Sequence, residues 1–423
     1  MKVLVVGSGG REHALCETFA RSVNVERLYC ASGNAGIASV AECVPISPED
    51  VRALADLAAD KGIDLTFVGG ETPLSFGIVD EFAARGLAIV GPTKKAAMLE
   101  SSKAFAKNLM SKYGVPTAAY EIAGSVSAAV EVLESGVFGP AEAPVVVKAD
   151  GLAAGKGVVV ARDRAEAIAA VRGLSDLVGG DAASTIVLEE CMYGREVSLL
   201  MFADGENYSL MPPVRDHKRI GEGDTGPNTG GMGTVTDDGK LLTDDQIREI
   251  EETIVLPTLR GCISEGYPFR GILFIGLMMT DAGPRVLEYN VRFGDPETQA
   301  VLVRLRTDLL DICKAMLTGR LNEIDIEWTE GSSACVVLAA EGYPARPRVG
   351  DAIEGLDEAA KTGVSIFHAG TRAGADGSIV TAGGRVLGIS ATAPTLGEAL
   401  NRAYAAADLI RWPGMQYRRD IGK

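Results

Sequence analysis

The sequence predicts a multidomain protein of mixed α/β and α+β class that begins with a doubly wound parallel sheet. At roughly 100 to 200 residues per domain, its 423 residues allow about two to four domains. Over about the first hundred residues, short β-branched segments alternate with alanine-rich segments, as in a parallel sheet covered by helices. The final part of the chain contains short strand segments and one late helical segment, which predicts a separate α+β unit.

The expected elements of the amino-terminal sheet follow one another closely. Strands are expected at 3–6, 27–30, 65–68 and 87–90, and helices at 11–21, 51–59 and 79–84. Sheets of this kind bind ligands at the carboxyl ends of their strands. Glycine-rich turns follow these ends at 7–10, 32–36 and 69–73, where backbone can approach a ligand closely.

The pattern changes near residue 101, where we place the first domain boundary. A lysine-bearing helix is expected at 102–112 and another helix at 164–171, and the central block ends in a polar stretch at 322–333. The predicted domains are therefore 1–101, 102–325 and 326–423. In the last domain, strands are expected at 334–340, 364–368 and 385–390, and a helix at 396–409.

Composition and charge limit the classes of function. Hydrophobic residues make up 47% and charged residues 23%, as in ordinary globular proteins, and no apolar run is long enough to span a bilayer. The amino terminus predicts a strand rather than a signal peptide, so we expect a cytoplasmic protein without membrane contact. The net charge of -16 disfavours a nucleic-acid partner. We expect small-molecule partners at compact anion sites, and a monomer or a weak dimer.

The glycines at 7–10 invite comparison with a dinucleotide-binding fingerprint. That fingerprint needs glycine or alanine where this chain has Glu12, and an acidic residue after the second strand, which 29–32 lacks. A nicotinamide cofactor is therefore the weaker hypothesis. A phosphate at the amino terminus of the first helix stays open, because backbone N–H groups and the helix dipole favour anions there. The alternative is that Gly9 and Gly10 only permit a tight turn.

The first strong motif is a glycine-rich loop between two valine-rich segments. A strand ends at Lys148, the loop covers 149–157, and further valines follow, which predicts a hairpin. The glycine spacing is not that of a Walker A loop, and no Ser or Thr follows Lys156. We interpret the loop as a lid that supplies N–H donors and a lysine to a triphosphate, with Lys148 as a fixed charge for an inner phosphate. A solvated hairpin tip is the alternative.

The second strong motif is a strand at 285–292. Period-two alternation places Glu288, Asn290 and Arg292 on one face, while the residues between them face the other side. A carboxylate and an amide oxygen suit Mg²⁺ that bridges nucleotide phosphates, and Arg292 suits a carboxylate or an acyl phosphate. The apolar segment 271–279 is the expected hairpin partner. Alone, this strand is an ordinary sheet edge; together with the lid it indicates ATP chemistry.

Two further stretches, 216–219 and 224–233, lie between these motifs and are rich in polar residues and glycine. The second cannot pack a core and can present many backbone donors, so we predict a substrate loop. His217 is either a general base or a polar surface histidine. His13 and His368 have no partner at metal-ligand spacing, so no histidine-based metal site is expected.

Together these motifs resemble the glycinamide ribonucleotide synthetase family of the ATP-grasp superfamily. They are GSGGREHA (7–14), KADGLAAGKG (148–157), DHKR (216–219), DTGPNTGGMG (224–233) and EYNVRFGDPET (288–298). The similarity continues through FHAGT (367–371) and GGRVL (383–387). It implies a central ATP-grasp domain with a mobile lid at about 118–190. It also implies a purine-biosynthesis ligase that joins glycine to 5-phosphoribosylamine through a glycyl phosphate, giving glycinamide ribonucleotide, ADP and phosphate.

The resemblance implies roles for the residues at the matching positions. Glu288 and Asn290 are expected to hold Mg²⁺, with Mn²⁺ as an alternative, and Arg292 and Lys148 are expected to be catalytic. ATP is expected to contact Lys103, Lys148, Gly151, Gly155, Lys156, Gly157, Glu189, Glu190, Met192 and Glu196. The other substrates are expected to contact Gly9, Gly10, Arg11, Asn34, Glu71, Asp216, Lys218, Asn228, Thr229, Gly230, Gly231, Met232 and Arg292. Members of the family often have Gly-Pro before the glutamate that corresponds to Glu71. This chain has Gly69-Gly70 there, and glycine in place of proline loosens the turn.

Two other functions stay open at this point. One is a related ATP-grasp enzyme that uses another carboxylate, such as a purine-pathway carboxylase or a formate-using transferase. The other is a nicotinamide-binding oxidoreductase built on the amino-terminal sheet.

Overall fold

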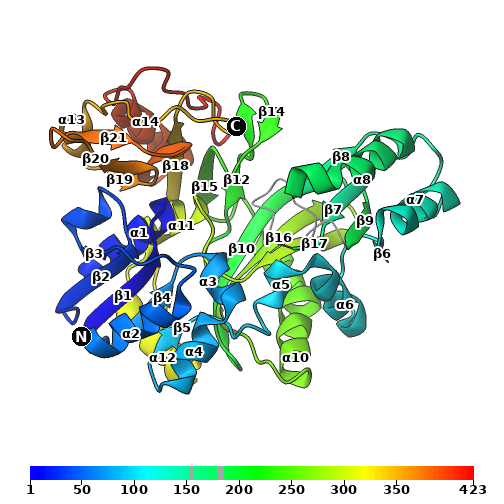
Figure 1. Ribbon diagram of the computed structural model, residues 1–423, viewed down its shortest axis with the longest axis horizontal. Coiled ribbons are helices and arrows are strands. Elements are labelled where there is room, and N and C mark those ends of the chain that lie inside the picture. Colours follow the sequence, from blue (N-terminus) through cyan, green and yellow to red (C-terminus); the bar gives the residue numbers. More distant parts are fainter. Residues whose placement is uncertain (152–156, 179–184) are drawn as a thin grey trace.

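The computed structural model describes residues 1–151, 157–178 and 185–423. Its amino-terminal part is a five-stranded parallel sheet in the order β3-β2-β1-β4-β5, drawn in blue in Figure 1. The strands are β1 (Lys2–Gly7), β2 (Arg27–Ser32), β3 (Glu42–Val44), β4 (Leu65–Val68) and β5 (Ile89–Val90). The helices are α1 (Gly10–Ala20), η1 (Ile37–Ser39), α2 (Val51–Lys61), α3 (Glu71–Phe76) and α4 (Ile78–Ala84). The predicted doubly wound sheet is confirmed.

Three of these elements, which are β3, η1 and α3, were not predicted from the sequence. Strand β3 is three residues long and no residue in it is fully buried, so it shows no alternation of apolar and polar residues. Helix α3 starts directly after Gly70 and contains Pro73, and these turn-forming residues mask a short helix. Proline is tolerated in a first helical turn because its missing N–H would have no partner there. Glu71 therefore lies in the first turn of a helix.

The centre of the molecule is a four-stranded antiparallel sheet in the order β11-β10-β16-β17. Its strands are β10 (Arg195–Asp204), β11 (Tyr208–Leu210), β16 (Arg270–Thr280) and β17 (Gly283–Asn290). The helices of this region are α5 (Met98–Ser101), α6 (Lys103–Tyr113), α9 (Asp244–Ile250), the π-helical turn η2 (Glu251–Val255) and α10 (Leu256–Ser264). One hydrophobic core joins this sheet to α2 and α4 of the amino-terminal part. The predicted hairpin of 271–279 with 285–292 is confirmed.

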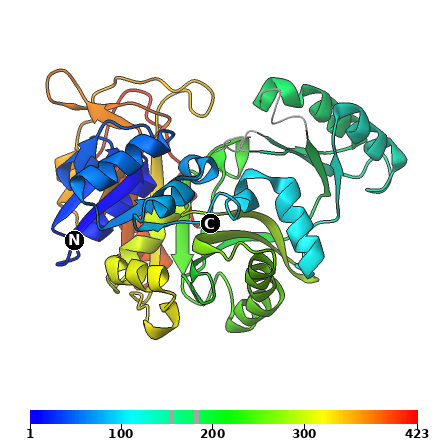
Figure 2. The ribbon, with the colours of Figure 1, turned by 60° about the horizontal axis from the view of Figure 1, so that its bottom comes forward.

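A second antiparallel sheet, in the order β6-β9-β7-β8, extends from this centre at the right of Figure 1 and is also seen in Figure 2. It consists of β6 (Tyr120–Ala123), β7 (Val145–Ala149), β8 (Val158–Ala161) and β9 (Ile186–Glu190). Helices α7 (Val126–Ser135) and α8 (Arg164–Val178) cover it and close its own core. The valine-rich hairpin is therefore present as predicted, while α8 extends further than the predicted helix 164–171.

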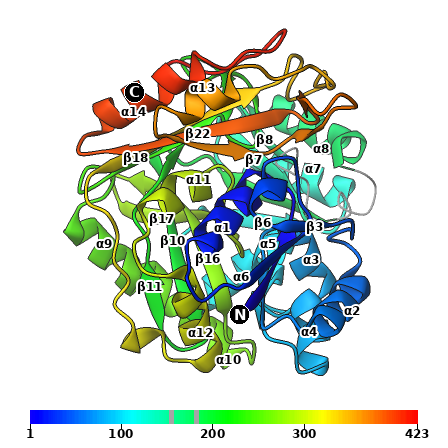
Figure 3. The same ribbon diagram turned by 90° about the vertical axis from the view of Figure 1, so that its left-hand side faces the viewer.

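The third large sheet, in the order β12-β15-β18-β22-β19, lies at the top of Figure 3. It combines β12 (Arg215–Asp216) and β15 (Gly233–Asp237) with β18 (Ser332–Ala339), β19 (Ser365–His368) and β22 (Arg385–Ala393). Nearby are the hairpins β13 (Arg219–Gly221) with β14 (Thr225–Asn228) and β20 (Thr371–Ala373) with β21 (Ile379–Thr381). The remaining helices are α11 (Glu297–Val301), η3 (Leu302–Arg304), α12 (Leu309–Thr318), η4 (Leu321–Glu323), α13 (Leu356–Ala360) and α14 (Leu396–Ala407).

This third sheet shapes the site, because its strands β12 and β15 flank the predicted substrate loop. The loop is thereby attached to the carboxy-terminal part of the chain although it is central in sequence. In the ranges that the structure describes, we find no helix with both the length and the apolar character needed to cross a membrane.

Candidate active site

Strand β17, which carries the predicted metal ligands, contains a β-bulge. Gly276 of β16 pairs with Glu288, and the next residue, Leu277, pairs with Val286, so Leu287 is an extra residue. A bulge of this kind re-aims the side chains that follow it. Here Val286 and Tyr289 are both buried in the core, while Glu288 is open to solvent.

Four cations surround the carboxylate of Glu288. Neighbouring atoms partly desolvate this carboxylate, which acts to raise its pKa, but the charges of Lys218, Lys148, Lys103 and Arg292 have the larger effect and lower the pKa. The four come from separate segments: the start of α6, the end of β7, the turn after β12 and the turn after β17. Such a concentration of positive charge in an acidic protein is suited to a polyphosphate.

Lys148 is held in place by a buried network. Its Nζ lies 2.8 Å from Glu189 Oε1 and donates a hydrogen bond of 3.2 Å to the carbonyl of Leu287. On the other side of the same carboxylate, Nζ of Lys107 lies 3.1 Å from Glu189 Oε2 and donates to Thr117 Oγ1 at 2.8 Å. Glu189 therefore bridges two lysines rather than presenting a free carboxylate.

No sequence motif singled out Lys107, which is only 2% exposed. Burial lowers the pKa of Lys107 to about 8, although the negative charge of Glu189 acts to raise it. Its position one turn after Lys103 on α6 could have indicated that both lysines share a helix face. In the structure the two have different partners.

The start of the glycine-rich loop is attached to the amino terminus of α6. Lys103 Nζ donates to the carbonyl of Gly151 at 3.0 Å. Asp150 accepts from Ser102 Oγ at 3.0 Å and from the backbone N–H of Ala104 at 3.1 Å. At the far end, the Gly157 carbonyl accepts from the N–H of Ala149 at 2.8 Å. Gly155 and Lys156, which the sequence also assigns to ATP, lie outside the described residues.

The residues predicted to contact adenine and ribose lie along the segment that joins β9 to β10. Glu190 accepts from the Ala119 N–H at 2.9 Å and from Arg285 Nη1 at 3.1 Å. Met192 is half-buried in the turn. Glu196 lies in β10 with Oε2 2.9 Å from Lys218 Nζ, so this carboxylate is linked to the cations around Glu288. Their roles toward ATP stay predictions.

Arg292 connects three carboxyl or amide groups. Its Nε donates to Glu71 Oε2 at 3.1 Å, and Nη2 lies 2.9 Å from Glu100 Oε1 and 3.3 Å from Asn290 Oδ1. Burial opposes the charge of Arg292, but Glu100 and Glu71 raise its pKa above the ordinary value. Glu100 is a partner that the sequence did not single out.

The donor set at Glu288 and Asn290 fits a divalent cation of the magnesium type. An ionised carboxylate and an amide oxygen are hard ligands, and Mg²⁺ is usually held by one or two protein groups together with substrate phosphates. In the part of the chain that the structure describes, no cluster of three or more His, Cys, Asp or Glu side chains could hold a metal ion by itself. The site therefore suits a metal shared with a nucleotide.

The predicted substrate residues at the start of α1 pack against the segment 295–299. The backbone N–H of Gly9 donates to Glu12 Oε2 at 2.6 Å, and that of Arg11 donates to Asp295 Oδ2 at 3.3 Å. A Cβ on Gly10 would lie 2.6 Å from Gln299 Nε2, so a larger residue at this position would require the Gln299 side chain to move. Two of the N–H groups that were expected for a phosphate thus already donate to carboxylates.

Asn34 fastens the second glycine-rich turn. Its side-chain nitrogen donates to the carbonyls of Ser8 at 2.8 Å and His368 at 2.7 Å. Its oxygen accepts from the N–H groups of Gly36 and Ile37 at 2.9 and 3.0 Å. These contacts join the amino-terminal turns to the carboxy-terminal sheet. A contact of Asn34 with a substrate stays a prediction.

Two residues in the second half of the predicted substrate loop, Thr229 and Met232, anchor it. Met232 is fully buried, and its N–H donates to the His217 carbonyl at 2.8 Å. Thr229 Oγ1 donates to the Lys218 carbonyl and accepts from the N–H of Gly231. Asn228 and Gly230, on either side of Thr229, are exposed. Burial and the nearby charge of Glu297 raise the pKa of Asp216, which precedes the loop in the chain.

His217 is buried, so it is not the polar surface histidine that was one of its two predicted roles, and the role of general base stays a prediction. Its Nδ1 lies 3.1 Å from the Gly233 carbonyl, and its Nε2 accepts from the Gly422 N–H at 3.0 Å. Both ring nitrogens are thus engaged, and burial lowers the pKa of His217 to about 4. The ring connects the substrate loop to the end of the described chain.

Arg385 is a residue of this region to which the sequence assigned no role, although it stands in the GGRVL motif. It donates to the carbonyls of Gly230 and Asp295, and its Nη2 lies 3.4 Å from Asp295 Oδ1. Burial opposes ionisation of Asp295, but Arg385 and Arg11 lower its pKa. Arg385 and Asp295 therefore hold the substrate loop against the turn after β17.

Arg418 is expected to position the substrate loop from the carboxy-terminal side. It is 2% exposed and binds Asp224 Oδ1 at 2.7 Å, Asp420 Oδ2 at 2.7 Å and the Arg219 carbonyl at 3.1 Å. We predict that Arg418→Met lowers the free energy of unfolding by about 1–3 kcal/mol, because it removes the hydrogen bonds of a buried guanidinium to Asp420 and the Arg219 carbonyl, whereas Asp224 is largely exposed to solvent. We also expect a larger rise in the KM for phosphoribosylamine, the substrate that the resemblance implies, than in the KM for ATP. Urea unfolding and steady-state kinetics check both; an equal change in the two KM values would contradict a positioning role.

Known proteins resemble this chain over its whole length. Three family models match in order: the N domain of phosphoribosylglycinamide synthetase at 1–100, its ATP-grasp (A) domain at 101–298 and its C domain at 333–423. The phosphoribosylamine–glycine ligase of Brucella melitensis is 47% identical, over 100% of this chain and 97% of its own length.

Solved structures agree. The phosphoribosylamine–glycine ligase of Thermotoga maritima has a TM-score of 0.85 at 35% identity, with 100% of both chains covered. The biotin carboxylase domain of Hydrogenobacter thermophilus 2-oxoglutarate carboxylase has a TM-score of 0.72 over 98% of this chain and 91% of its own. At 17% identity, that likeness concerns the fold alone. The predicted resemblance and fold class are confirmed, and the chain belongs to the phosphoribosylamine–glycine ligase family.

Proposed function

We propose that this protein makes glycinamide ribonucleotide from ATP, glycine and 5-phosphoribosylamine by way of a glycyl phosphate, in de novo purine biosynthesis. A glycine carboxylate oxygen attacks the γ-phosphorus of ATP, and ADP leaves. The amine of phosphoribosylamine then attacks the acyl carbon, loses a proton and expels phosphate. The observation that carries the proposal is the convergence of four cations, from four segments, on Glu288.

In this proposal Lys103 and Lys148 bind phosphates of ATP, and Arg292 stabilises the charge of the acyl phosphate. Phosphoryl transfer depends mainly on positioning and on fixed positive charge, since the transition state spreads negative charge over the phosphoryl oxygens. The buried Lys107–Glu189 pair keeps Lys148 in place, and Glu71 with Glu100 keeps Arg292 in place. Lys148 and Arg292 are thus held in position before the substrates bind.

Glu288 and Asn290 are the residues that would hold the metal ion. When bound, Mg²⁺ neutralises phosphate charge and orients the nucleotide. Mn²⁺ is an alternative ion at the same donors. The turns at 7–10, 32–36 and 69–73, together with the loop 226–233, would surround the phosphoribosylamine. We expect the protein to act in the cytoplasm as a monomer or a weak dimer.

Release of ADP is expected only when ATP, Mg²⁺, glycine and phosphoribosylamine are all present. A coupled ADP assay in which each component is omitted in turn checks this requirement. Glycine labelled with ¹⁸O in its carboxylate should transfer one labelled oxygen to the released phosphate, because the acyl phosphate breaks at the carbon side. ADP release with bicarbonate or formate in place of glycine would instead indicate a related ATP-grasp enzyme. Product formation without label in the phosphate would refute the glycyl phosphate.

A further inference from the structure

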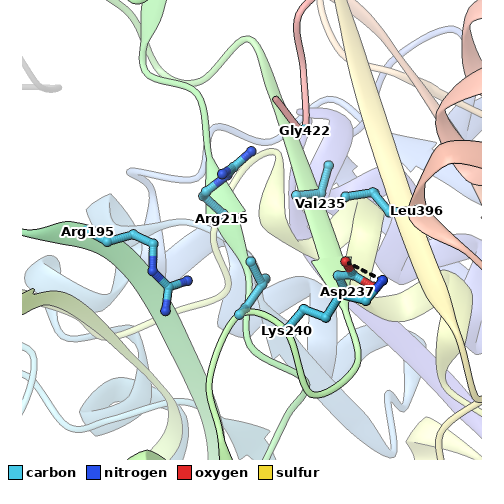
Figure 4. Close-up of a pocket in the computed structure, with 8 residues that line it drawn as sticks. Arg195, Arg215, Val235, Asp237, Lys240, Leu396 and Gly422 are labelled. Atoms are coloured by element: carbon cyan, nitrogen blue, oxygen red, sulfur yellow. Dashed lines mark ion pairs between the residues drawn. The ribbon is translucent and has the colours of Figure 1, made fainter.

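A second charged cavity lies apart from the cations around Glu288. Its volume is about 400 Å³, within the range typical of small-molecule sites. Figure 4 shows its lining residues, which are Arg195, Arg215, Val235, Asp237, Lys240, Leu241, Leu396 and Gly422. They come from β10, β12, β15, the turn after β15, the start of α14 and the last residues of the chain.

The charges of this cavity are unbalanced toward the positive. Arg195, Arg215 and Lys240 face a single carboxylate, Asp237. That carboxylate is already engaged, because it lies 3.4 Å from Lys240 Nζ and accepts from Ser332 Oγ at 2.8 Å. The two arginines thus lack a carboxylate of the lining to pair with.

Arg215 forms no ion pair with an Asp or Glu side chain among the described residues. Burial, and then the charge of Arg195, lower its pKa, while Asp224 acts against them. Its Nη2 donates to the Lys423 carbonyl at 2.8 Å, but its buried Nε has no hydrogen-bond partner among the described residues. A buried donor without a partner costs free energy, which an anion in the cavity would recover.

The cavity is distinct from the site described above although it uses the same strands. Arg195 precedes Glu196 in β10, and Arg215 precedes Asp216 in β12. Successive side chains of a strand point to opposite faces. The arginines therefore lie on the reverse side of the strands that carry Glu196 and Asp216.

We propose that this cavity binds a small organic phosphate monoester. Two guanidinium groups and an ammonium group match the double charge and the several acceptor oxygens of a phosphate better than the single charge of a carboxylate. Of the apolar lining residues, Leu396 is half-buried and offers a surface for the organic part of such a ligand, while Val235 and Leu241 are almost fully buried. The site belongs to no step of the proposed reaction.

Calorimetric titration of the whole protein with adenosine monophosphate tests the proposal. The protein is first saturated with ADP and Mg²⁺, so that the nucleotide site is filled. We expect one further adenosine monophosphate per chain, and at least tenfold weaker binding in both Arg215→Gln and Lys240→Gln. The control Arg248→Gln removes an exposed arginine of α9 that pairs with Asp245, and should leave binding unchanged.

The proposal requires that both variants bind adenosine monophosphate more weakly. Lys240 lies outside the predicted substrate loop, so weaker binding in its variant cannot be attributed to a change in that loop. Lys240 is exposed and its replacement is not expected to disturb folding, so the test holds even if Arg215→Gln is unstable. Inorganic phosphate is titrated in parallel and should bind at least tenfold more weakly than adenosine monophosphate. Equal binding of adenosine monophosphate by wild type and variants, absence of the extra site, or equal affinity for inorganic phosphate would each overturn the proposal.

Discussion

Replacing Glu288 with alanine is expected to lower Mg²⁺-dependent kcat by at least about a hundredfold while the protein still folds. A metal bound to substrate phosphates contributes several kcal/mol to transition-state stabilisation, and each 1.4 kcal/mol corresponds to roughly a tenfold change in rate. Glu288 is solvent-exposed at the bulge of β17, so its removal opens no cavity in the core. Steady-state kinetics over a range of Mg²⁺ concentrations, with circular dichroism as a check of folding, measure both effects.

The matched control is Glu249→Ala, which removes an exposed glutamate of α9 and should keep the wild-type rate. Glu288→Ala also removes the one carboxylate at the centre of four cations. Binding of the anionic nucleotide should therefore survive in this variant even though turnover is lost. A wild-type rate, or a loss of turnover together with a loss of nucleotide binding, would contradict the metal-binding role of Glu288.

Replacing Lys148 with alanine is expected to raise the KM for ATP by roughly 10 to 100-fold. A hydrogen bond to a charged group contributes about 1.5–3 kcal/mol, and about 1.4 kcal/mol corresponds to a tenfold change in affinity. The effect should be large because Lys148 is fixed by Glu189 and the Leu287 carbonyl and loses little freedom when a phosphate binds. Initial rates at varied ATP and saturating glycine measure it.

Two further variants distinguish a loss of ATP binding from a loss of stability. Lys107→Met removes the other cation beside Glu189 and should reduce stability more than it raises the KM for ATP, since Lys107 is buried away from solvent. Lys112→Ala removes an exposed lysine of α6 and should change neither. An unchanged KM for ATP in Lys148→Ala would show that this lysine does not bind the nucleotide.

Much of the fold could be predicted because its signals are local. The alternation of β-branched and alanine-rich segments predicted the parallel sheet, and the valines on either side of the glycine-rich loop predicted the hairpin of β7 and β8. Helix α3, which packs against α4 and α5, was missed because Gly70 and Pro73 are turn signals. Strand β3 was missed because three residues are too few to show a period.

The strand β17 was predicted correctly, but the bulge within it could not be predicted from the sequence pattern. Strict alternation predicted that Leu287 and Tyr289 share a face. The structure instead buries Tyr289 together with Val286, because Leu287 is the extra residue of the bulge. A period of two in the sequence cannot reveal where one residue is added, since the partner strand β16 determines the pairing.

The sequence by itself determined the family, the fold class and the residue types that suit ATP and a divalent cation. These properties depend on motifs whose residues are adjacent in the chain. The tertiary structure decided which of these residues meet. It brought Lys103, Lys148, Lys218 and Arg292 around Glu288, and it turned His217 into an anchor for the substrate loop. The physical reason is that charges and hydrogen bonds act over a few ångströms, and only folding brings distant segments that close.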